Sequence, residues 1–305
     1  MKKRIILAGG TGFLGIELAK QLTELDYHPV ILSRNPDSYT GPGKVVFWDG
    51  KTIDKIWLEE IDGATAIINL AGKNVNCRPT ARNRKTILDS RVQSVAVLGE
   101  ALRLVPNPPE IWIQAGSLAI YGDAGDRICD EAARVATGYP ANVCVDWEAA
   151  LGEAILPGTR WVNLRIGFVL GSEGGALPFL ARLTKLGLGG SIGNGKQYIS
   201  WIHLDDMLKI FIEAIENPTM AGTYNTTGPT PVTNAEFMTT LRSVLGRPWS
   251  PPAPALVVKL GAPLLNSDPA IALTGRRCVP AKLTDEGFNF HYLTLKHALE
   301  SIYLK

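Results

Sequence analysis

The stretch RIILAGGTGFLG, residues 4–15, places a glycine-rich turn between two apolar segments. Its first half predicts a buried strand over Arg4–Ala8, and the residues after the turn predict an amphipathic helix over Phe13–Leu25. Glycines in such a turn let the backbone approach a pyrophosphate closely, and the N-terminus of the helix attracts its negative charge. The segment Gly9–Gly15 therefore predicts a dinucleotide site, with a purely structural turn as the alternative interpretation.

Further along the chain, short apolar runs alternate with amphipathic stretches, the pattern of parallel strands joined by crossover helices. Further strands are expected at His28–Leu32, Val45–Trp48, Ala66–Leu70, Ile111–Ala115 and Trp161–Ile166, and helices at Arg84–Arg103, Val143–Ile155, Asp205–Glu216 and Asn234–Leu245. Strands this apolar are buried on both faces. We therefore predict an α/β fold, a Rossmann-type doubly wound parallel sheet with a smaller C-terminal substrate or cap domain. The nucleotide-binding domain is expected over residues 1–170, with about 200–228 returning to it, and the cap over residues 171–305.

The end of the second strand indicates which dinucleotide is bound. An NAD site usually has a carboxylate there, about 20 residues after the last glycine, which accepts a hydrogen bond from the ribose 2′-hydroxyl. This chain has Ser33 and Arg34 instead, and its next carboxylate is Asp37. An arginine can pair with a 2′-phosphate, and a serine can donate to it. NADP(H) is thus the predicted cofactor; in the alternative interpretation, Arg34 is a solvated loop residue.

Composition excludes several classes of function. The 305 residues carry 31 Lys and Arg against 29 Asp and Glu, a formal net charge of +2. This balance argues against nucleic acid and membrane as partners. A small-molecule substrate is expected, and the sequence leaves monomer and dimer open. No apolar run reaches about 18 residues and no signal-peptide core follows Met1, so a cytoplasmic location is expected. Four dispersed cysteines and four histidines without ligand spacing predict no metal site.

Several motifs resemble one known family. The spacing Gly9-x-x-Gly12-x-x-Gly15 resembles the extended short-chain dehydrogenase/reductases. Asn69–Gly72 is similar to their N-N-A-G segment, and Ser117-x-x-x-Tyr121 is similar to the serine strand of sugar-nucleotide epimerases. More narrowly, the chain resembles the atypical, mostly uncharacterised branch of the NAD(P)-dependent epimerase/dehydratase-like family, which ends in a short C-terminal domain of unknown function, here about residues 250–298. The segments that carry this narrower resemblance include Ser90-Arg91, Trp147-Glu148, Leu164–Gly167, Gly174–Leu177, Ser200–His203, Tyr224-Asn225, Pro280–Leu283 and Gly287–Phe290.

The resemblance implies an NADP pocket assembled from separate parts of the chain. The implied contacts are Gly9, Thr11, Gly12, Phe13, Leu14 and Gly15 along the diphosphate, Ser33 and Arg34 at the 2′-phosphate, and Leu70, Ala71 and Gly72 near the adenosine half and the central ribose. Ser117 would lie at the nicotinamide end, where family enzymes use a serine hydroxyl to bind the reacting carbonyl.

The chain departs from the family at the catalytic pair. Family enzymes use Tyr-x-x-x-Lys, in which the lysine lowers the pKa of the tyrosine so that the phenol shuttles a proton near neutral pH. Tyr139 has Val143 as its fourth neighbour, and an alternative alignment places Pro140 and Cys144 at the two positions. Residues 86–184 contain no lysine at all. The standard pair is absent.

Other groups are candidates for the missing roles, each with a simpler alternative. Tyr121 could donate a proton itself, or it could be packed beneath the end of the strand. Lys73 could supply a cation beside the cofactor groove, or it could be a solvated loop residue. Cys144 could be a nucleophile, although buried thiols are usually inert.

The sequence after residue 190 predicts part of the cleft wall. Trp201 and the loop Gly193–Gln197 are expected to line the substrate cleft. Asp205 is expected to cap the following helix, and His203 to make a structural hydrogen bond.

Two functional hypotheses remain. The first is an NADP-dependent oxidoreductase or epimerase acting on a small carbonyl or sugar-nucleotide substrate, which the retained Ser117 and the expected cleft residue Trp201 favour. The second is a catalytically silent NADPH-binding protein that signals redox state through a partner, which the missing Tyr–Lys pair favours.

Overall fold

The computed structural model describes residues 3–264 and 266–304. Its centre is a seven-stranded parallel sheet in the order β11-β7-β5-β4-β1-β2-β3. These strands are β1 (Arg4–Ala8), β2 (His28–Ser33), β3 (Lys44–Phe47), β4 (Ala66–Asn69), β5 (Ile111–Ser117), β7 (Arg160–Ile166) and β11 (Gly222–Thr226). The strand order reverses beside β1, with β2 on one side and β4 on the other, which confirms the predicted doubly wound Rossmann-type sheet.

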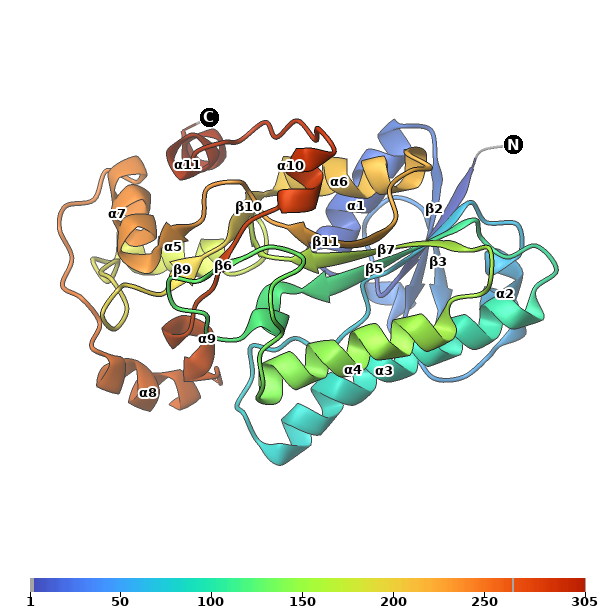
Figure 1. The fold of residues 1–305 in the computed structure, drawn as a ribbon, viewed down its shortest axis with the longest axis horizontal. Helices are drawn as coiled ribbons and strands as arrows, with labels where there is room; N and C mark the ends of the chain where they lie inside the picture. The colour runs from blue at the N-terminus through green and yellow to red at the C-terminus, as the bar shows by residue number, and fades with distance from the viewer. Residues whose placement is uncertain (1–2, 265, 305) are drawn as a thin grey trace.

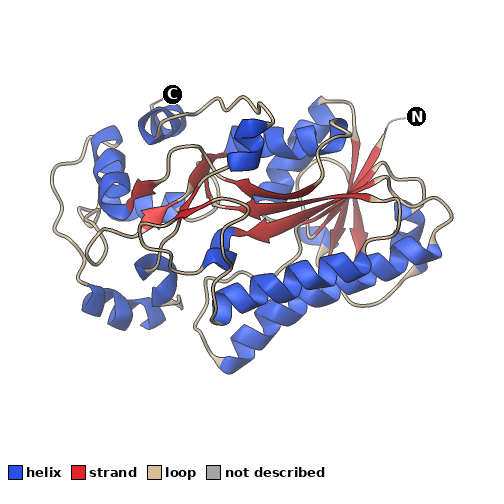
Figure 2. Ribbon diagram, viewed as in Figure 1, coloured by secondary structure: helices blue, strands red, loops and turns tan. Residues whose placement is uncertain are grey.

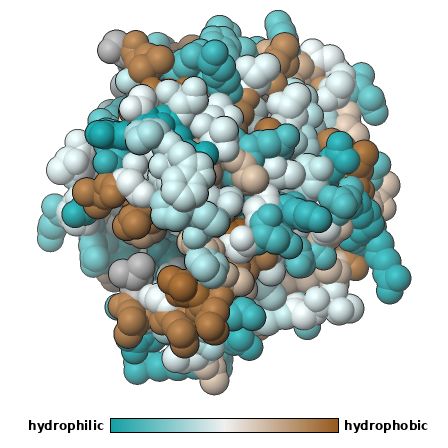
Figure 3. All heavy atoms as spheres, turned by 90° about the vertical axis from the view of Figure 1, so that its left-hand side faces the viewer, coloured by the Kyte–Doolittle hydropathy of each residue, from teal (hydrophilic) through white to brown (hydrophobic). Residues whose placement is uncertain are grey.

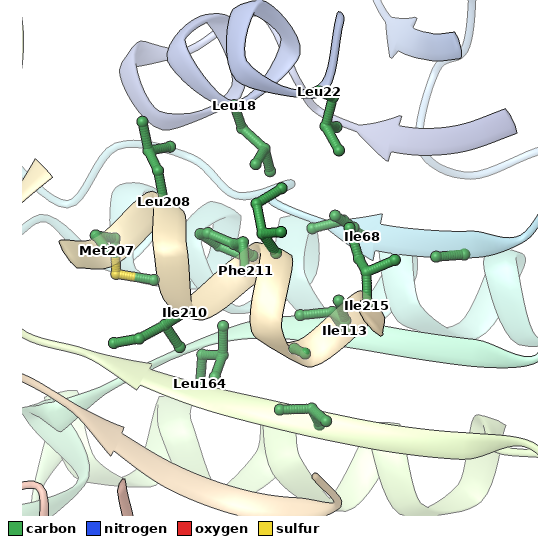
Figure 4. Close-up of a cluster of buried hydrophobic side chains, with 14 of the residues drawn as sticks. Leu18, Leu22, Ile68, Ile113, Leu164, Met207, Leu208, Ile210, Phe211 and Ile215 are labelled. Carbon is green, nitrogen blue, oxygen red and sulfur yellow. The ribbon is translucent and has the colours of Figure 1, made fainter. Parts of the chain in front are cut away.

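Helices cover both faces of this sheet (Figures 1 and 2). One face carries α1 (Phe13–Glu24) and α6 (Leu204–Glu216), and the other carries α2 (Lys55–Ile61), α3 (Ala81–Leu104) and α4 (Tyr139–Ala154). Figure 4 shows Phe211 of α6 between Leu18 of α1 and the sheet residue Ile113. Each of these side chains is fully buried, which stabilises the fold by about 1.5–3 kcal/mol per side chain. This packing holds the helices against the sheet and so fixes the positions of the carboxyl ends of its strands.

Local capping sets three helix starts that differ from the sequence prediction. Helix α3 begins at Ala81 because the Thr80 hydroxyl accepts a hydrogen bond from the Asn83 amide. Helix α4 begins at Tyr139, directly after Gly138 at φ 105°, which only glycine adopts readily. The prediction that Asp205 caps α6 was wrong. His203 is the cap, and its Nδ1 accepts from the Asp205 amide at 3.1 Å.

The C-terminal region packs at one end of the sheet (Figure 1). Its helices are α5 (Leu177–Lys185), α7 (Asn234–Val244), α8 (Ala255–Leu264), α9 (Pro269–Leu273), α10 (Ala281–Asp285) and α11 (Leu295–Tyr303). Two-stranded pairs join β6 (Ile128–Cys129) to β13 (Arg277–Cys278), β8 (Phe168–Leu170) to β10 (Trp201–His203), and β9 (Tyr198–Ile199) to β12 (Val232–Thr233). The pairing of β13 with β6 ties the end of the chain to the loop after β5.

Helix α8 has no buried residue, and its apolar side chains form a brown patch low on the face in Figure 3. None of the helices within residues 3–264 and 266–304 is long and apolar enough to cross a membrane.

Candidate cofactor and substrate site

The turn between β1 and α1 leaves open space at one glycine and close packing at the others. Gly9 has φ +74°, and a Cβ there would lie 2.7 Å from the Ala71 Cα. A Cβ at Gly15 would collide with the backbone of Gly10. By contrast, among the residues that the structure describes, a Cβ at Gly12 would meet nothing within 4 Å and no side chain caps α1 at this residue. The free amide groups of the first helical turn therefore face open space, which fits a pyrophosphate.

The other residues of the predicted diphosphate and ribose contacts surround this turn. Thr11 and Leu14 are half-buried, and the ring of Phe13 packs against the loop at Gly171 and Gly174. Leu70 follows β4 directly, and its amide donates to the Ala8 carbonyl at 2.8 Å. Leu70, Ala71 and Gly72 therefore lie at the carboxyl edge of the sheet beside the glycine turn.

Ser33 and Arg34 lie at the end of β2, the strand next to β1. Ser33 is buried, and its Oγ accepts from the Asn35 amide at 3.1 Å. Arg34 is exposed. Arg34 is therefore the more accessible of the two for a 2′-phosphate, and the assignment of this pair to that phosphate stays a prediction.

A cavity of about 390 Å³ opens where β5 and β7 end. Ser117, the last residue of β5, lines it, and its Oγ accepts from the Ala119 amide at 3.1 Å. The hydroxyl hydrogen of Ser117 can therefore still be donated to a ligand. The cavity also takes residues from α3, from the start of α4, and from the segments around Tyr198 and Arg276.

Helix α4 presents Tyr139, Pro140 and Cys144 to this cavity. Burial raises the pKa of the Cys144 thiol to about 11, so it stays protonated at neutral pH and is a poor nucleophile. The Tyr139 Oη is shielded from solvent and has no hydrogen-bond partner in the described part of the chain. Burial raises the pKa of Tyr139, against the opposing charges of Arg91 and Arg84, so its phenol also keeps its proton.

Comparisons with known proteins agree with this geometry. Residues 5–226 match the NAD dependent epimerase/dehydratase family, and residues 253–302 match a domain of unknown function, DUF1731. The chain belongs to the NAD dependent epimerase/dehydratase family. It is 34% identical to the epimerase family protein ML0860 of Mycobacterium leprae over 300 residues, which cover 98% of this chain and 95% of that protein. It is 33% identical to the human epimerase family protein SDR39U1 over 306 residues, or 98% of this chain and 99% of that protein.

Solved structures extend the comparison to the whole fold. The crystal structure of human SDR39U1 (isoform 2) with NADPH superimposes with a TM-score of 0.86 at 31% identity, covering 99% of each chain. The structure of MoeE5 with UDP-glucose and NAD has a TM-score of 0.77 at 19% identity, and that likeness shows the fold alone. The epimerase-family fold therefore extends over both matched segments of this chain.

The structure places Tyr121, one of the two candidate catalytic residues, in the core of this family member. It is fully buried and lies outside the residues that line the cavity. Its Oη donates to Asn225 Oδ1 at 2.8 Å and accepts from Arg165 Nη1 at 2.7 Å. Arg165 in turn makes a bidentate pair with Glu148, at 2.7 and 2.8 Å. Burial raises the pKa of Tyr121 to about 12, so its phenol keeps its proton. The burial and the two hydrogen bonds favour the alternative interpretation, packing beneath the end of the strand.

Tyr121→Phe is expected to lower the free energy of unfolding by about 1–3 kcal/mol, because Arg165 Nη1 and Asn225 Oδ1 both lose a buried partner. Equilibrium unfolding in urea measures this change. Tyr303→Phe is the matched control: the Tyr303 Oη is shielded too, but it has no partner within the described residues, so its loss should cost little. Equal stability of both variants would contradict the structural role of Tyr121.

The prediction that Trp201 lines the substrate cleft is wrong. Trp201 is fully buried, packs with Phe237 and Leu241, and donates from Nε1 to the Thr230 carbonyl at 2.8 Å, so it cannot line a cleft. The pairing of β10 with β8 turns its ring into the core of the C-terminal region. Tyr198, a few residues earlier, lines the cavity instead.

Side-chain hydrogen bonds hold both the loop Gly193–Gln197 and Lys73 in place. The Gln197 side-chain amide donates to the carbonyls of Ile192 and Ala272 and so holds the loop to α9. The Lys73 ammonium donates to Asn83 Oδ1 at 2.8 Å, and Lys73 is not among the residues around the cavity. Asn83 itself lines the cavity, so Lys73 contacts the cavity wall through this residue, and its expected place beside the cofactor groove stays a prediction.

Sequence reasoning missed the arginines of the cavity. Arg78, Arg84 and Arg91 come from α3 and the loop before it, and Arg276 comes from the C-terminal region. Ser90-Arg91 was noted only as a family motif. Arg84 and Arg91 lie seven residues apart on one helix, and this two-turn spacing is the one signal that could have indicated a shared basic face.

Proposed function

We propose that this protein is an NADP(H)-dependent oxidoreductase of the epimerase family, acting on a small carbonyl compound. The observation that carries the proposal is the open space at Gly12 beside an uncapped helix N-terminus, in the same sheet edge as a cavity lined by Ser117. The NADPH in the human SDR39U1 crystal structure supports the choice of cofactor, because that chain matches this one along its whole length.

The proposed role of each residue follows from its position in the site. The amides at the start of α1 would hold the diphosphate, and Arg34 would pair with the 2′-phosphate. When bound, NADPH supplies a hydride for a carbonyl carbon. Ser117 would donate a hydrogen bond to the carbonyl oxygen as negative charge develops on it. Tyr139, which lines the same cavity and keeps its proton, is the candidate proton donor.

The role of Arg34 gives a direct test of cofactor choice. Wild-type protein should bind NADPH more tightly than NADH by about 1.5–3 kcal/mol, the magnitude of charge-assisted hydrogen bonds. Arg34→Ala should shrink this gap by weakening NADPH alone, as fluorescence titration with both cofactors can measure. Arg247→Ala, at another exposed arginine, should leave the gap unchanged. Equal affinity of the wild type for both cofactors would overturn the assignment of Arg34.

The second candidate function is a catalytically silent NADPH sensor. Pro140 and the protonated Cys144 at the positions of the family's Tyr–Lys pair favour it. A screen of aldehydes, ketones and sugar nucleotides that follows NADPH fluorescence separates the two functions. Turnover of any of these compounds supports the oxidoreductase, and tight NADPH binding without turnover supports the sensor.

A cytoplasmic location and the choice between monomer and dimer stay predictions from the sequence. The Arabidopsis thaliana relative, 31% identical over 308 residues, is named as a chloroplastic protein.

A further inference from the structure

The cavity beside Ser117 is strongly basic. Four arginines, Arg78, Arg84, Arg91 and Arg276, line it, and Asp268 is the single carboxylate among the described lining residues. Its Oδ1 accepts from the Ala270 amide at 2.9 Å and caps α9, and its one negative charge offsets at most one of the four positive charges. The positive charge of the cavity is therefore not balanced from within.

The four guanidinium groups contact only neutral partners. Within residues 3–264 and 266–304, no carboxylate forms an ion pair with any of them. Arg78 Nε donates to the Pro263 carbonyl, Arg91 Nη1 donates to the carbonyls of Lys73 and Ile87, and Arg276 Nε donates to the Gly122 carbonyl. Arg84 stacks on the ring of Tyr139, with its Cζ 4.7 Å from the ring centroid. Each arginine thus keeps N–H donors free for another acceptor.

The surroundings make two of these unpaired charges costly, those of Arg91 and Arg276, whereas Arg78 and Arg84 are exposed. Ile87, Leu118, Val143 and Phe168 line the same cavity, and Arg91 lies over the ring of Trp147 at 4.9 Å. Burial lowers the pKa of Arg91 and of Arg276 below the usual value for arginine. An anion bound in such apolar surroundings interacts with a guanidinium far more strongly than it does in water.

We propose that the cavity binds its substrate through an anionic group, a carboxylate or a phosphate, which Arg84 and Arg91 of α3 and Arg276 of the C-terminal region hold between them. The proposal rests on the proposed function for the carbonyl that reacts near Ser117. It specifies a small organic acid or phosphate ester, because about 390 Å³ lies near the lower end of the range for small-molecule sites. Anion and carbonyl would lie in one cavity, so the charged group orients the reacting carbon.

Equilibrium binding tests this without requiring turnover. Benzoate, inorganic phosphate and UDP-glucose are titrated calorimetrically into the full chain, with and without NADPH. We expect at least one of the two small anions to bind, and the stronger one identifies carboxylate or phosphate as the recognised group. Arg84→Gln and Arg276→Gln should each weaken that anion about 10-fold, the effect of losing one charge-assisted hydrogen bond.

Arg82→Gln is the matched control, because Arg82 lies on the same helix as Arg84 but outside the cavity lining. Arg84 and Arg82 are both exposed, so neither change should affect folding. Arg276→Gln also removes the bond to Gly122, so the folding of this variant is checked by circular dichroism. If Arg276→Gln unfolds, the Arg84→Gln variant decides the question. Binding of neither small anion, equal binding by all variants, or binding of UDP-glucose alone would overturn the inference.

Turnover supplies a second, separable readout. If the protein reduces aldehydes, 4-carboxybenzaldehyde should have a KM at least about 10-fold lower than benzaldehyde, and Arg84→Gln should remove the difference. Equal KM values for the two aldehydes would overturn the anion proposal and leave the proposed function intact. Failure to bind NADPH would overturn the proposed function, whereas the titration of cofactor-free protein would still decide the anion proposal.

Discussion

Gly12→Val is expected to weaken NADPH binding by at least about 100-fold while the protein stays folded. A valine side chain here would fill the space that the diphosphate needs, next to the free amides of α1. The backbone accepts the change, because Gly12 has φ −85° and ψ 177°, an extended conformation that suits valine. Nothing in the described chain lies within 4 Å of the new Cβ, so no core contact is disturbed. Calorimetric titration with NADPH and thermal unfolding together measure both parts of the expectation.

Gly152→Ala is the control for this change. Gly152 is exposed on α4, and a Cβ there also meets nothing within 4 Å. This variant should bind NADPH as the wild type does and should be slightly more stable, because alanine favours a helix over glycine. A folded Gly12→Val variant with wild-type affinity would place the dinucleotide elsewhere.

Ser117→Ala is expected to lower turnover about 100-fold and to leave NADPH affinity nearly unchanged. We propose the Ser117 hydroxyl as the group that binds the carbonyl, because it lies at the end of β5 and at the edge of the cavity. Alanine also removes the bond that the Ala119 amide donates to Oγ, so unfolding is measured beside the kinetics. Ser172→Ala, in an exposed loop, should change neither quantity. Full turnover without the Ser117 hydroxyl would remove it from the mechanism, and an inactive wild type that binds NADPH tightly would favour the sensor.

The sheet and the glycine turn could be predicted because their signals are local. Apart from β11, the strands of the sheet are short runs rich in apolar residues, and Arg4–Ala8 leads directly into the glycines, so neighbouring residues carry the pattern. Strand β11 could not be predicted in this way, because Gly222–Thr226 is half polar and becomes a strand by pairing with β7.

The substrate side could be predicted only in part, because its residues meet through tertiary pairing. Arg84 and Arg276 are far apart in the sequence, and the pairing of β13 with β6 brings Arg276 to the cavity. Trp201 shows the opposite error: it was expected in the cleft wall, but its strand pairing directs it inward. Apolar periodicity also does not distinguish His203 from Asp205 as the N-cap of α6. The cap is the residue whose side chain accepts a hydrogen bond from a backbone amide of the first turn, here His203.

The pairing of β13 with β6 has a consequence for the order in which this molecule acquires its parts during synthesis. The ribosome delivers the chain from its N-terminus, so the glycine turn and the end of β5 emerge long before Arg276. Strand β6 has no partner in its two-stranded sheet until residues 277–278 follow. A nascent chain that has already made β11 thus holds all seven strands of the main sheet but lacks one arginine wall of the cavity. The segment that matches the domain of unknown function is thus the one that completes the wall of the cavity.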